Sequence, residues 1–279
     1  YKMKKLNFIF FLLLFAILKS CSNYNDIYNV MSFNIRLDTP SDGINNWENR
    51  KEGIISIIKN QKIDILGVQE ALPNQIDYLA KQFDGYSLIG QGRDGGNNGE
   101  YSAILYNETR LMLNESGTFW LSETPNIPSI GWDAALNRIV TFGEFKVLNS
   151  NKKLVVYNSH FDHIGETARE KSADIILNHI EKNNYYNSAV VVMGDFNAKP
   201  YESPIKILSE SLDDSFIVFP FEKPFGTFNG FEINSKLDHR IDYIFSKNIK
   251  LTDYIHVYDK LLNGLWPSDH LPIVISFSL

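Results

Sequence analysis

The sequence has a single cysteine, Cys21, among its 279 residues. One thiol excludes an intrachain disulfide and any metal cluster that is built on several thiolates. Basic residues are not in excess either, because 27 Lys and Arg stand against 33 Asp and Glu, which gives a net charge of −6. A protein that coats a nucleic-acid duplex needs a basic surface. We therefore expect any phosphate to be held locally, through a bound cation.

The longest apolar run is too short to cross a membrane. A stretch of 13 residues, Leu6–Leu18, is apolar apart from Asn7, whereas a membrane-spanning helix needs about 20 residues. Two lysines precede the stretch and Cys21 follows it, which is the arrangement of a secretory signal. A cysteine at this place resembles the lipobox of bacterial lipoproteins, in which the thiol receives the lipid. A plain signal peptide and an uncleaved anchor are the alternatives.

This pattern predicts that residues 1–21 are a signal peptide and that the protein is exported. We expect an envelope lipoprotein anchored at Cys21, in the periplasm or on the outer membrane or cell surface. Without the four lysines of residues 1–20 the net charge falls from −6 to −10. The remaining chain has no internal repeat, low-complexity tract or Pro/Gly-rich linker. We therefore expect one domain over residues 26–279, in a monomer.

Strand-like segments dominate the chain after residue 26. Many are continuous apolar runs, as in strands that are covered on both faces. The predicted strands are Val30–Leu37, Ile63–Gln69, Tyr86–Gly90, Ser102–Tyr106, Gly117–Leu121, Ile139–Leu148, Leu154–Ser159, Ala189–Met193, Asp242–Phe245, Tyr254–Tyr258 and Ile273–Phe277.

Helical periodicity is rarer. Ile54 and Ile58 share one helical face, as do Ile76 and Leu79, and the longest predicted helix covers about residues 167–183. Helices scattered between many strands indicate the α/β class. The expected architecture is two packed sheets with helices outside them, a layered α/β sandwich.

Polar side chains stand at the ends of the predicted strands. They are Asn34, Glu70, His160, Asp195 with Asn197, and Asp269 with His270, and Asp242 lies inside a strand. A buried acid costs several kcal/mol unless it is paired or bound to a metal. Carboxylate and amide oxygens suit a hard cation such as Mg²⁺, or Mn²⁺ in its place. The set therefore fits metal-assisted phosphoryl transfer, in which a carboxylate or histidine activates water.

These motifs resemble the endonuclease/exonuclease/phosphatase superfamily, which includes deoxyribonuclease I, exonuclease III-type nucleases, neutral sphingomyelinases and inositol polyphosphate 5-phosphatases. The stretches SFNIR, GVQE, NSHFDH, GDFN, RIDYIF and SDHLP are most similar to the carbon-catabolite-repressor deadenylase and nocturnin branch. TFWLSETP and GWDAALNR resemble the bacterial relatives of that branch in particular. The resemblance covers residue 28 to the C-terminus. It implies a four-layered α/β sandwich, with two mixed sheets flanked by helices, and a catalytic domain over residues 26–279.

The resemblance also implies a role for each matching residue. Glu70 is then the principal Mg²⁺ ligand, with Asn34 beside it in contact with the metal or the phosphate, and Asp269 completes the metal shell or supports the site. His160 binds the scissile phosphate and stabilises its charge. Asp195 activates or positions the attacking water, and Asn197 holds water and a phosphate oxygen. His270 contacts the phosphate and is oriented by Asp242. The general base stays open between Asp195 and His270, and one or two metals fit the pattern.

Three further residues are candidate substrate contacts. Arg169 starts the longest predicted helix and would clamp a phosphate or form a surface salt bridge. Arg138 and Trp132 would line the substrate groove, although Trp132 is equally suited to the core. The aromatic loop around Phe228 would stack a base or sugar, or pack beneath the loop.

Other classes fit the sequence less well. Asn158 to His163 partly matches the HxHxDH signature of metallo-β-lactamase-type hydrolases, but position 158 is Asn. Calcineurin-type phosphoesterases need DxH and GNH[DE] motifs that are absent from this sequence. A lipoprotein that only binds phosphorylated ligands is the non-enzymatic alternative.

The predicted activity is hydrolysis of phosphodiester bonds. The branch resemblance favours a 3′–5′ exonuclease that acts on RNA. Predicted export instead favours a phosphodiesterase or phosphatase acting on phosphoglycans, inositol phosphates or lipid head groups, with the membrane contacted only through the lipid anchor. Family members differ in substrate through their loops rather than through the shared site. The sequence therefore fixes the reaction class more firmly than the substrate.

Overall fold

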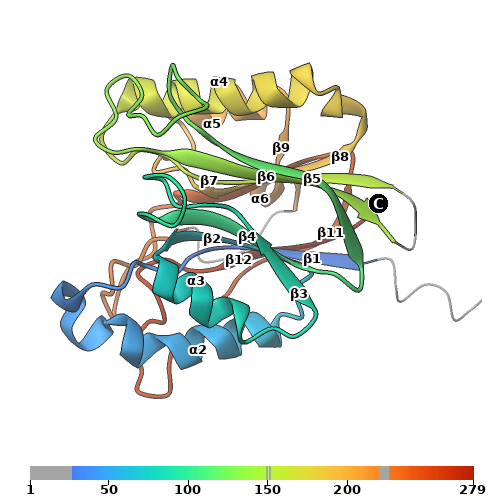
Figure 1. Ribbon diagram of the computed structural model, residues 1–279. Helices are drawn as coiled ribbons and strands as arrows, with labels where there is room; N and C mark the ends of the chain where they lie inside the picture. Colours follow the sequence, from blue (N-terminus) through green and yellow to red (C-terminus); the bar gives the residue numbers. More distant parts are fainter. Residues whose placement is uncertain (1–26, 149, 151, 220–225) are drawn as a thin grey trace, which may run out of the picture.

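Two six-stranded sheets pack face to face in the computed structural model, which describes residues 27–148, 150, 152–219 and 226–279 (Figure 1). In the first sheet the strand order is β11 (Lys250–His256), β12 (Ile273–Ser278), β1 (Ile27–Asn34), β2 (Ile65–Ala71), β4 (Tyr101–Asn107) and β3 (Tyr86–Ile89). In the second it is β5 (Leu111–Trp120), β6 (Ile139–Val147), β7 (Lys153–His160), β8 (Ala189–Asp195), β10 (Asp242–Lys247) and β9 (Asp213–Asp214). Both sheets mix parallel and antiparallel pairs.

Helices cover the outer faces of this pair of sheets (Figure 1). Helices α2 (Trp47–Asn60) and α3 (Pro73–Ala80) lie on the first sheet, whereas α4 (Glu166–Lys182) and α5 (Ser203–Ser209) lie on the second. Short helical segments are η1 (Pro40–Asn45), η2 (Tyr185–Asn187) and α6 (Ser215–Val218). The four layers confirm the predicted α/β sandwich.

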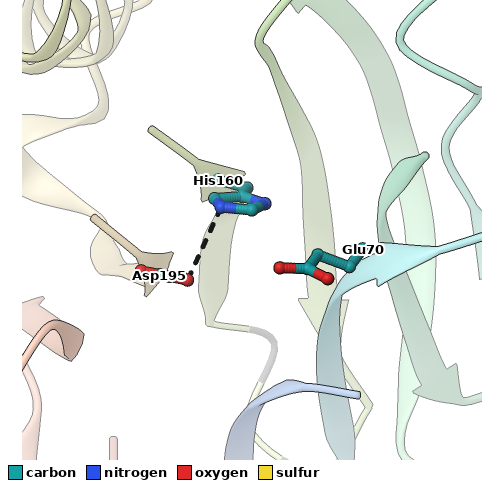
Figure 2. Close-up of side chains that lie close together, drawn as sticks. All are labelled: Glu70, His160 and Asp195. Atoms are coloured by element: carbon teal, nitrogen blue, oxygen red, sulfur yellow. Dashed lines mark ion pairs between the residues drawn. The ribbon is translucent and has the colours of Figure 1, made fainter. Parts of the chain in front are cut away.

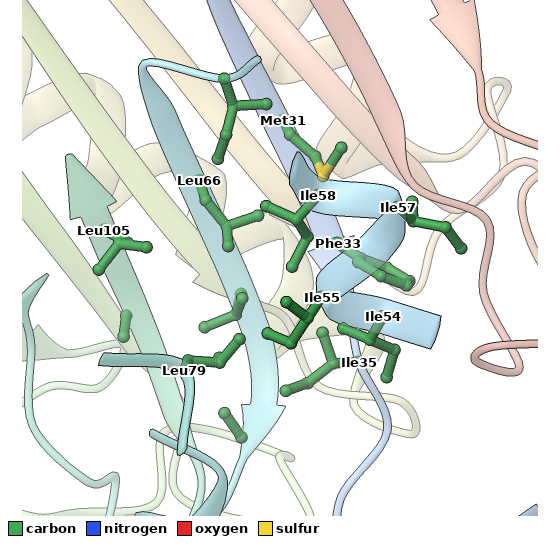
Figure 3. Packing of buried hydrophobic residues seen from close by; sticks show 14 of the residues in the cluster. Met31, Phe33, Ile35, Ile54, Ile55, Ile57, Ile58, Leu66, Leu79 and Leu105 are labelled. Carbon is green, nitrogen blue, oxygen red and sulfur yellow. The ribbon is translucent and has the colours of Figure 1, made fainter. Parts of the chain in front are cut away.

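Separate apolar clusters fill the spaces between the layers. Figure 3 shows one of them, in which Ile54 and Ile58 of α2 pack on Phe33 and Leu66 of the first sheet. Each such isoleucine contributes roughly 1.5–3 kcal/mol when it is fully buried. A second cluster joins α4 to the second sheet, and a third lies between the two sheets. Because β2 and β8 are covered on both faces, every residue in them is buried, as their continuous apolar runs predicted.

The predicted element boundaries were less accurate than the elements. Strand β5 begins at Leu111 rather than Gly117, and β11 ends at His256 rather than Tyr258. Strand β1 ends at Asn34 rather than Leu37, because Arg36 has a positive φ of 60° and leaves the strand path. The short β9, α5 and α6 were not predicted, since none has a clear hydrophobic period.

The predicted signal segment, residues 1–21 with Cys21, lies outside the described residues. Among the residues that the structure does describe, no helix is both long and apolar enough to span a bilayer.

Candidate active site

Strand register brings the sequence-predicted polar residues together. In the first sheet β1 and β2 are parallel and pair Asn34 with Gln69, the neighbour of Glu70. In the second sheet β7 and β8 are parallel and pair His160 with Asp195, and the antiparallel β10 pairs Asp242 with Asp195. Since parallel strands end at the same edge of a sheet, each sheet collects its polar side chains at one edge.

Asn34 joins the two halves of the site. Its Nδ2 donates to Oε1 of Glu70 and to Oδ2 of Asp195, both at 3.0 Å. Its Oδ1 accepts from the backbone N–H of Arg36 at 3.0 Å. Asn34 is fully buried, so these bonds satisfy an amide that would otherwise be costly to bury. One side chain thus fixes a carboxylate of each sheet relative to the other.

The backbone at Glu70 is strained. The β2–β4 register shifts between Val68 and Ala71, which marks a β-bulge, and Glu70 has a φ of +62°. A bulge turns a side chain away from its regular direction, and a non-glycine residue in this region costs on the order of 1–3 kcal/mol. The Leu37 N–H donates to Glu70 Oε2 at 3.2 Å and helps to hold the carboxylate in place.

Glu70, His160 and Asp195 form a set that is suited to a metal ion. Figure 2 shows the three side chains directed toward a common space, and their ligand atoms lie within 4.8 Å of one another. All three are buried. Two carboxylates and one imidazole match the donors that divalent cations prefer, so the residues present fit a metal.

Asp269, predicted as a further metal ligand, lies beside this set rather than within it. The guanidinium of Arg36 lies between Glu70 and Asp269, with Nη1 3.7 Å from Glu70 Oε2 and 3.8 Å from Asp269 Oδ2. The same guanidinium makes two 3.0 Å bonds to Asp42. Ser268 Oγ donates to the backbone carbonyl of Asn34 at 2.6 Å, which ties this loop to the end of β1.

His270 is held by two carboxylates. Its Nδ1 lies 2.9 Å from Asp242 Oδ2, and its Nε2 lies 3.6 Å from Asp195 Oδ2. Burial disfavours the imidazolium, but the charges of Asp242 and Asp195 outweigh burial and raise the pKa of His270 well above its usual value. His270 is therefore cationic at neutral pH. Its contact with Asp242 agrees with the orienting role that the family resemblance implied.

His160 is buried among cations instead. Burial lowers its pKa well below the usual value, and the charges of Arg138 and His270 lower it further. Its Nε2 lies 3.0 Å from Asn197 Nδ2 and 3.5 Å from Asp195 Oδ2. His160 is thus a neutral hydrogen-bonding group, which can stabilise the charge of a phosphate through a hydrogen bond.

Asp195 lies at the centre of the constellation. Burial raises the pKa of its carboxyl group above the usual value, the charge of His270 opposes this effect, and the charge of Asp242 adds to it. Asn197, which has a φ of +46°, donates its backbone N–H to Asp195 Oδ1 at 3.0 Å. Gly194 is required here, because a Cβ would approach the carbonyl oxygen of Ser159 to 1.9 Å.

The three candidate substrate contacts lie in different surroundings. Arg138 is buried beside His160 in a recess, and its Nε is 3.3 Å from Asp162 Oδ2. Arg169 is also buried, and its Nη1 donates to the carbonyl of Asp162 at 3.0 Å, so it does not form a surface salt bridge. Trp132 is half-buried rather than part of the core, with a φ of +46°.

Asp162 anchors the loop that follows β7. Burial alone would raise the pKa of Asp162, but the N–H groups of Gly165 and Ile164 and the charge of Arg138 lower it to about 2. Asp162 therefore holds the start of α4 and the guanidinium of Arg138 in place.

Phe228 lies at the rim of the site. Its ring centroid is 5.1 Å from that of His270, in an edge-on arrangement, and 36% of the residue is exposed. Phe231 instead packs below the loop, over the guanidinium of Arg50 at 5.3 Å. Of the aromatic loop, Phe225 lies outside the described residues.

Sequence reasoning did not identify Arg50 or the pair of Arg93 and Glu100. Arg50 is buried and donates to the carbonyls of Ile35 at 2.8 Å and Pro267 at 2.7 Å, which joins the end of β1 to the loop before His270. The sequence carried no signal for Arg50, because α2 also contains the charged residues Glu48, Lys51, Glu52 and Lys59. Arg93 and Glu100 bound a glycine-rich loop that carries no periodicity.

The profile of the Endonuclease/Exonuclease/phosphatase family matches residues 31–270. The chain is 33% identical to a mannosyl-6-phosphatase from Bacteroides thetaiotaomicron, with a TM-score of 0.85 over 90% of this chain and all of that one. An endonuclease/exonuclease/phosphatase from Bacteroides vulgatus is 32% identical, with a TM-score of 0.86 over 91% of this chain and 99% of that one.

The catalytic domain of human nocturnin shares the fold. Its TM-score is 0.71 at 22% identity, over 90% of this chain and 94% of that one. Members of the matched family are metal-dependent hydrolases of phosphoric esters. With its buried set of acids and histidines, this chain belongs to the endonuclease/exonuclease/phosphatase family and is a phosphoric ester hydrolase.

Proposed function

We propose that this protein removes phosphate from a phosphorylated sugar, with Mg²⁺ as the metal and Mn²⁺ as a substitute. The carrying observation is the similarity, along nearly the whole chain, to a protein described as a mannosyl-6-phosphatase. The proposal selects the phosphoglycan alternative from the sequence analysis over the exonuclease.

The charges around the site support a small substrate. Arg36 is paired with Asp42, Arg93 with Glu100, and Arg138 with Asp162. A long polyanion needs several cations that remain available for its phosphates. These three guanidinium groups already have carboxylate partners. They therefore suit a substrate with a single phosphate whose remaining part, the sugar, is uncharged.

The metal would be held by Glu70 and Asp195, with His160 at the edge of the set. When bound, it supplies positive charge next to the phosphate oxygens, which stabilises the transition state. Asn34 keeps the two carboxylates in register, and Arg36 balances the charge of Glu70 and Asp269.

The protein's own groups then divide the proton chemistry. Asp195, whose pKa burial raises, accepts a proton from the attacking water as the water oxygen bonds to phosphorus. The bond between phosphorus and the sugar oxygen breaks, and the sugar oxygen takes a proton from solvent. The cationic His270, held by Asp242, donates a hydrogen bond from Nε2 to a phosphate oxygen and stabilises its charge. His160 and Asn197 orient the phosphate as neutral partners.

The test incubates the purified chain with mannose 6-phosphate and, separately, with a 5′-labelled RNA oligonucleotide, each in Mg²⁺ and in EDTA. We expect phosphate release from the sugar in Mg²⁺, none in EDTA, and recovery with Mn²⁺. Glu70→Gln should abolish turnover while the far-ultraviolet circular dichroism is unchanged. Phosphate release that persists in EDTA or in Glu70→Gln contradicts the proposed mechanism, and binding without any turnover favours the non-enzymatic alternative.

One observation favours the RNA exonuclease as a second candidate. Phe228 exposes 36% of its surface beside His270, where it would stack a nucleobase. A metal-dependent ladder that shortens from the 3′ end, without release of phosphate from the sugar, would establish this alternative.

We also propose that the protein is an exported lipoprotein anchored at Cys21, where it would meet sugar phosphates outside the cytoplasm. Labelling with radioactive palmitate and its loss in Cys21→Ala test this. Label that persists in the variant contradicts the anchor.

A further inference from the structure

A narrow recess opens beside His160. Arg93, Glu100 and Arg138 contribute its charged walls, and Asn137 and Ser102 lie between them. Arg93 and Glu100 come from the loop before β4, which the sequence analysis did not connect with catalysis, whereas Arg138, just before β6, was a predicted substrate contact. His160 lines the same recess, so the recess adjoins the position proposed for the substrate phosphate, and its volume of about 10 Å³ admits a hydroxyl-sized group rather than a whole sugar.

Arg93 and Glu100, two charged side chains of the loop, form a bidentate ion pair. Arg93 Nη1 lies 2.7 Å from Glu100 Oε2, and Arg93 Nη2 lies 2.7 Å from Glu100 Oε1. Their side chains are only 14% and 15% exposed. A nearly buried pair of this kind contributes little to stability compared with well-packed apolar residues. The desolvation cost of burying this ion pair therefore indicates a role other than stabilising the fold.

The loop that carries the pair is rigidly placed. The Arg93 N–H donates to the Glu100 carbonyl at 2.9 Å, and Trp120 Nε1 donates to the Arg93 carbonyl at 2.6 Å. Asn137 Nδ2 donates to Asp94 Oδ1 at 3.0 Å, which links the loop to the strand of Arg138. The donors and acceptors of the pair are thus fixed before any ligand arrives.

The pair has no net charge, and Arg138 is likewise balanced by Asp162. A second phosphate would gain little from this recess. A carboxylate that accepts hydrogen bonds and a guanidinium that donates them match adjacent hydroxyl groups, each of which does both. We propose that Arg93 and Glu100 bind the hydroxyl groups of the sugar whose phosphate lies against His160. This inference rests on the proposed function and identifies the residues that select its substrate.

The first experiment compares two substrates in one variant. The ratio of kcat/KM for mannose 6-phosphate to that for phenyl phosphate is measured in the wild type and in Glu100→Gln. Loss of a charged hydrogen bond to a hydroxyl weakens binding by about 10- to 100-fold, so we expect the ratio to fall by that factor. Glu144→Gln, which alters the Glu144–Lys153 pair in the middle of the second sheet, is the control and should leave the ratio unchanged.

The second experiment needs no variant and therefore does not depend on the folding of Glu100→Gln. The wild-type protein is given mannose 6-phosphate and its 2-, 3- and 4-deoxy analogues. A site that pairs with a hydroxyl rejects the analogue that lacks it, so at least one analogue should lose about 10-fold or more in kcat/KM.

The outcomes separate the two proposals. If the wild type hydrolyses mannose 6-phosphate but accepts every deoxy analogue equally, or if Glu100→Gln lowers kcat/KM equally for both substrates, the sugar subsite is wrong while the proposed function stands. If the wild type hydrolyses phenyl phosphate but no sugar phosphate, the proposed function fails and the subsite fails with it.

Discussion

The two histidines of the site are equally buried but differ in charge. His160 and His270 expose 8% and 4% of their surface. Burial lowers the pKa of both. His270 nevertheless has a raised pKa because Asp242 is bonded to its Nδ1 and Asp195 lies beside its Nε2. His160 also has Asp195 at 3.5 Å, but it is bonded to the neutral Asn197 and is repelled by the cations Arg138 and His270.

The difference shows that burial keeps an active-site imidazole neutral unless carboxylate charge outweighs it, as it does at His270, where Asp242 is bonded directly to the ring. An opposite charge within about 4–6 Å changes a pKa by roughly 1–3 units. The site thereby holds one cationic and one neutral imidazole at the same pH. The neutral imidazole, His160, belongs to the set with Glu70 and Asp195 and therefore adds no repulsion to a metal ion held there.

Removal of the cationic histidine should have the largest effect. His270→Ala deletes the group that stabilises the phosphate charge, so we expect kcat to fall by about 100- to 10,000-fold. Steady-state kinetics at neutral pH measure this, with circular dichroism as a check on folding. His239→Gln, at a side chain that is 52% exposed, is the matched control and should retain normal kcat. A kcat near that of the wild type in His270→Ala would remove this residue from the mechanism.

Asp242→Asn should make the two histidines more alike. Without the Asp242 charge the pKa of His270 falls, and the cationic form is lost at a lower pH. Activity that needs the imidazolium disappears as pH rises through its pKa, so the alkaline limb of the kcat profile should move about 1–3 units toward acid. A limb that stays in place would show that another group sets it.

Asn197→Asp should instead make His160 more like His270, by placing a carboxylate next to it. The position has a φ of +46°, which aspartate tolerates, and the new carboxylate would lie near His160 Nε2. The pKa of His160 should then rise by roughly 1–3 units. Titration of the His160 resonances by NMR measures it, and kcat should fall about 10-fold as the neutral form becomes scarcer. An unchanged titration would contradict the assignment of Asn197 as the partner of His160.

The smallest effect is expected at Phe228, whose ring lies edge-on to that of His270. Phe228→Leu keeps an apolar side chain, so kcat for the sugar phosphate should change by about 10-fold at most, because an edge-on ring pair contributes only about 0.5–1.5 kcal/mol. RNA hydrolysis that falls much further than sugar phosphate hydrolysis would instead support the exonuclease.

Much of the candidate site was predictable because chemistry-bearing residues stood at strand ends. Asn34, Glu70 and Asp195 meet as expected, and Asp242 holds His270. The placement of Arg169 was not predictable, since a helix start gives no information on whether a guanidinium turns toward a ligand or toward the backbone carbonyl that it contacts.

Local patterns determined the sandwich and the identity of the polar strand ends, because hydrophobic periodicity and residue chemistry are encoded over a few neighbouring positions. Only the tertiary structure decided the rest. The bulge that turns Glu70 depends on pairing with β4, and the charge of each histidine depends on residues far along the chain, Asp242 and Asp195 for His270 and Arg138 for His160. Arg50 likewise donates to the carbonyl of Pro267, 217 positions away. Electrostatic and hydrogen-bonding partners are set by distance in space, and a sequence specifies that distance only through the completed fold.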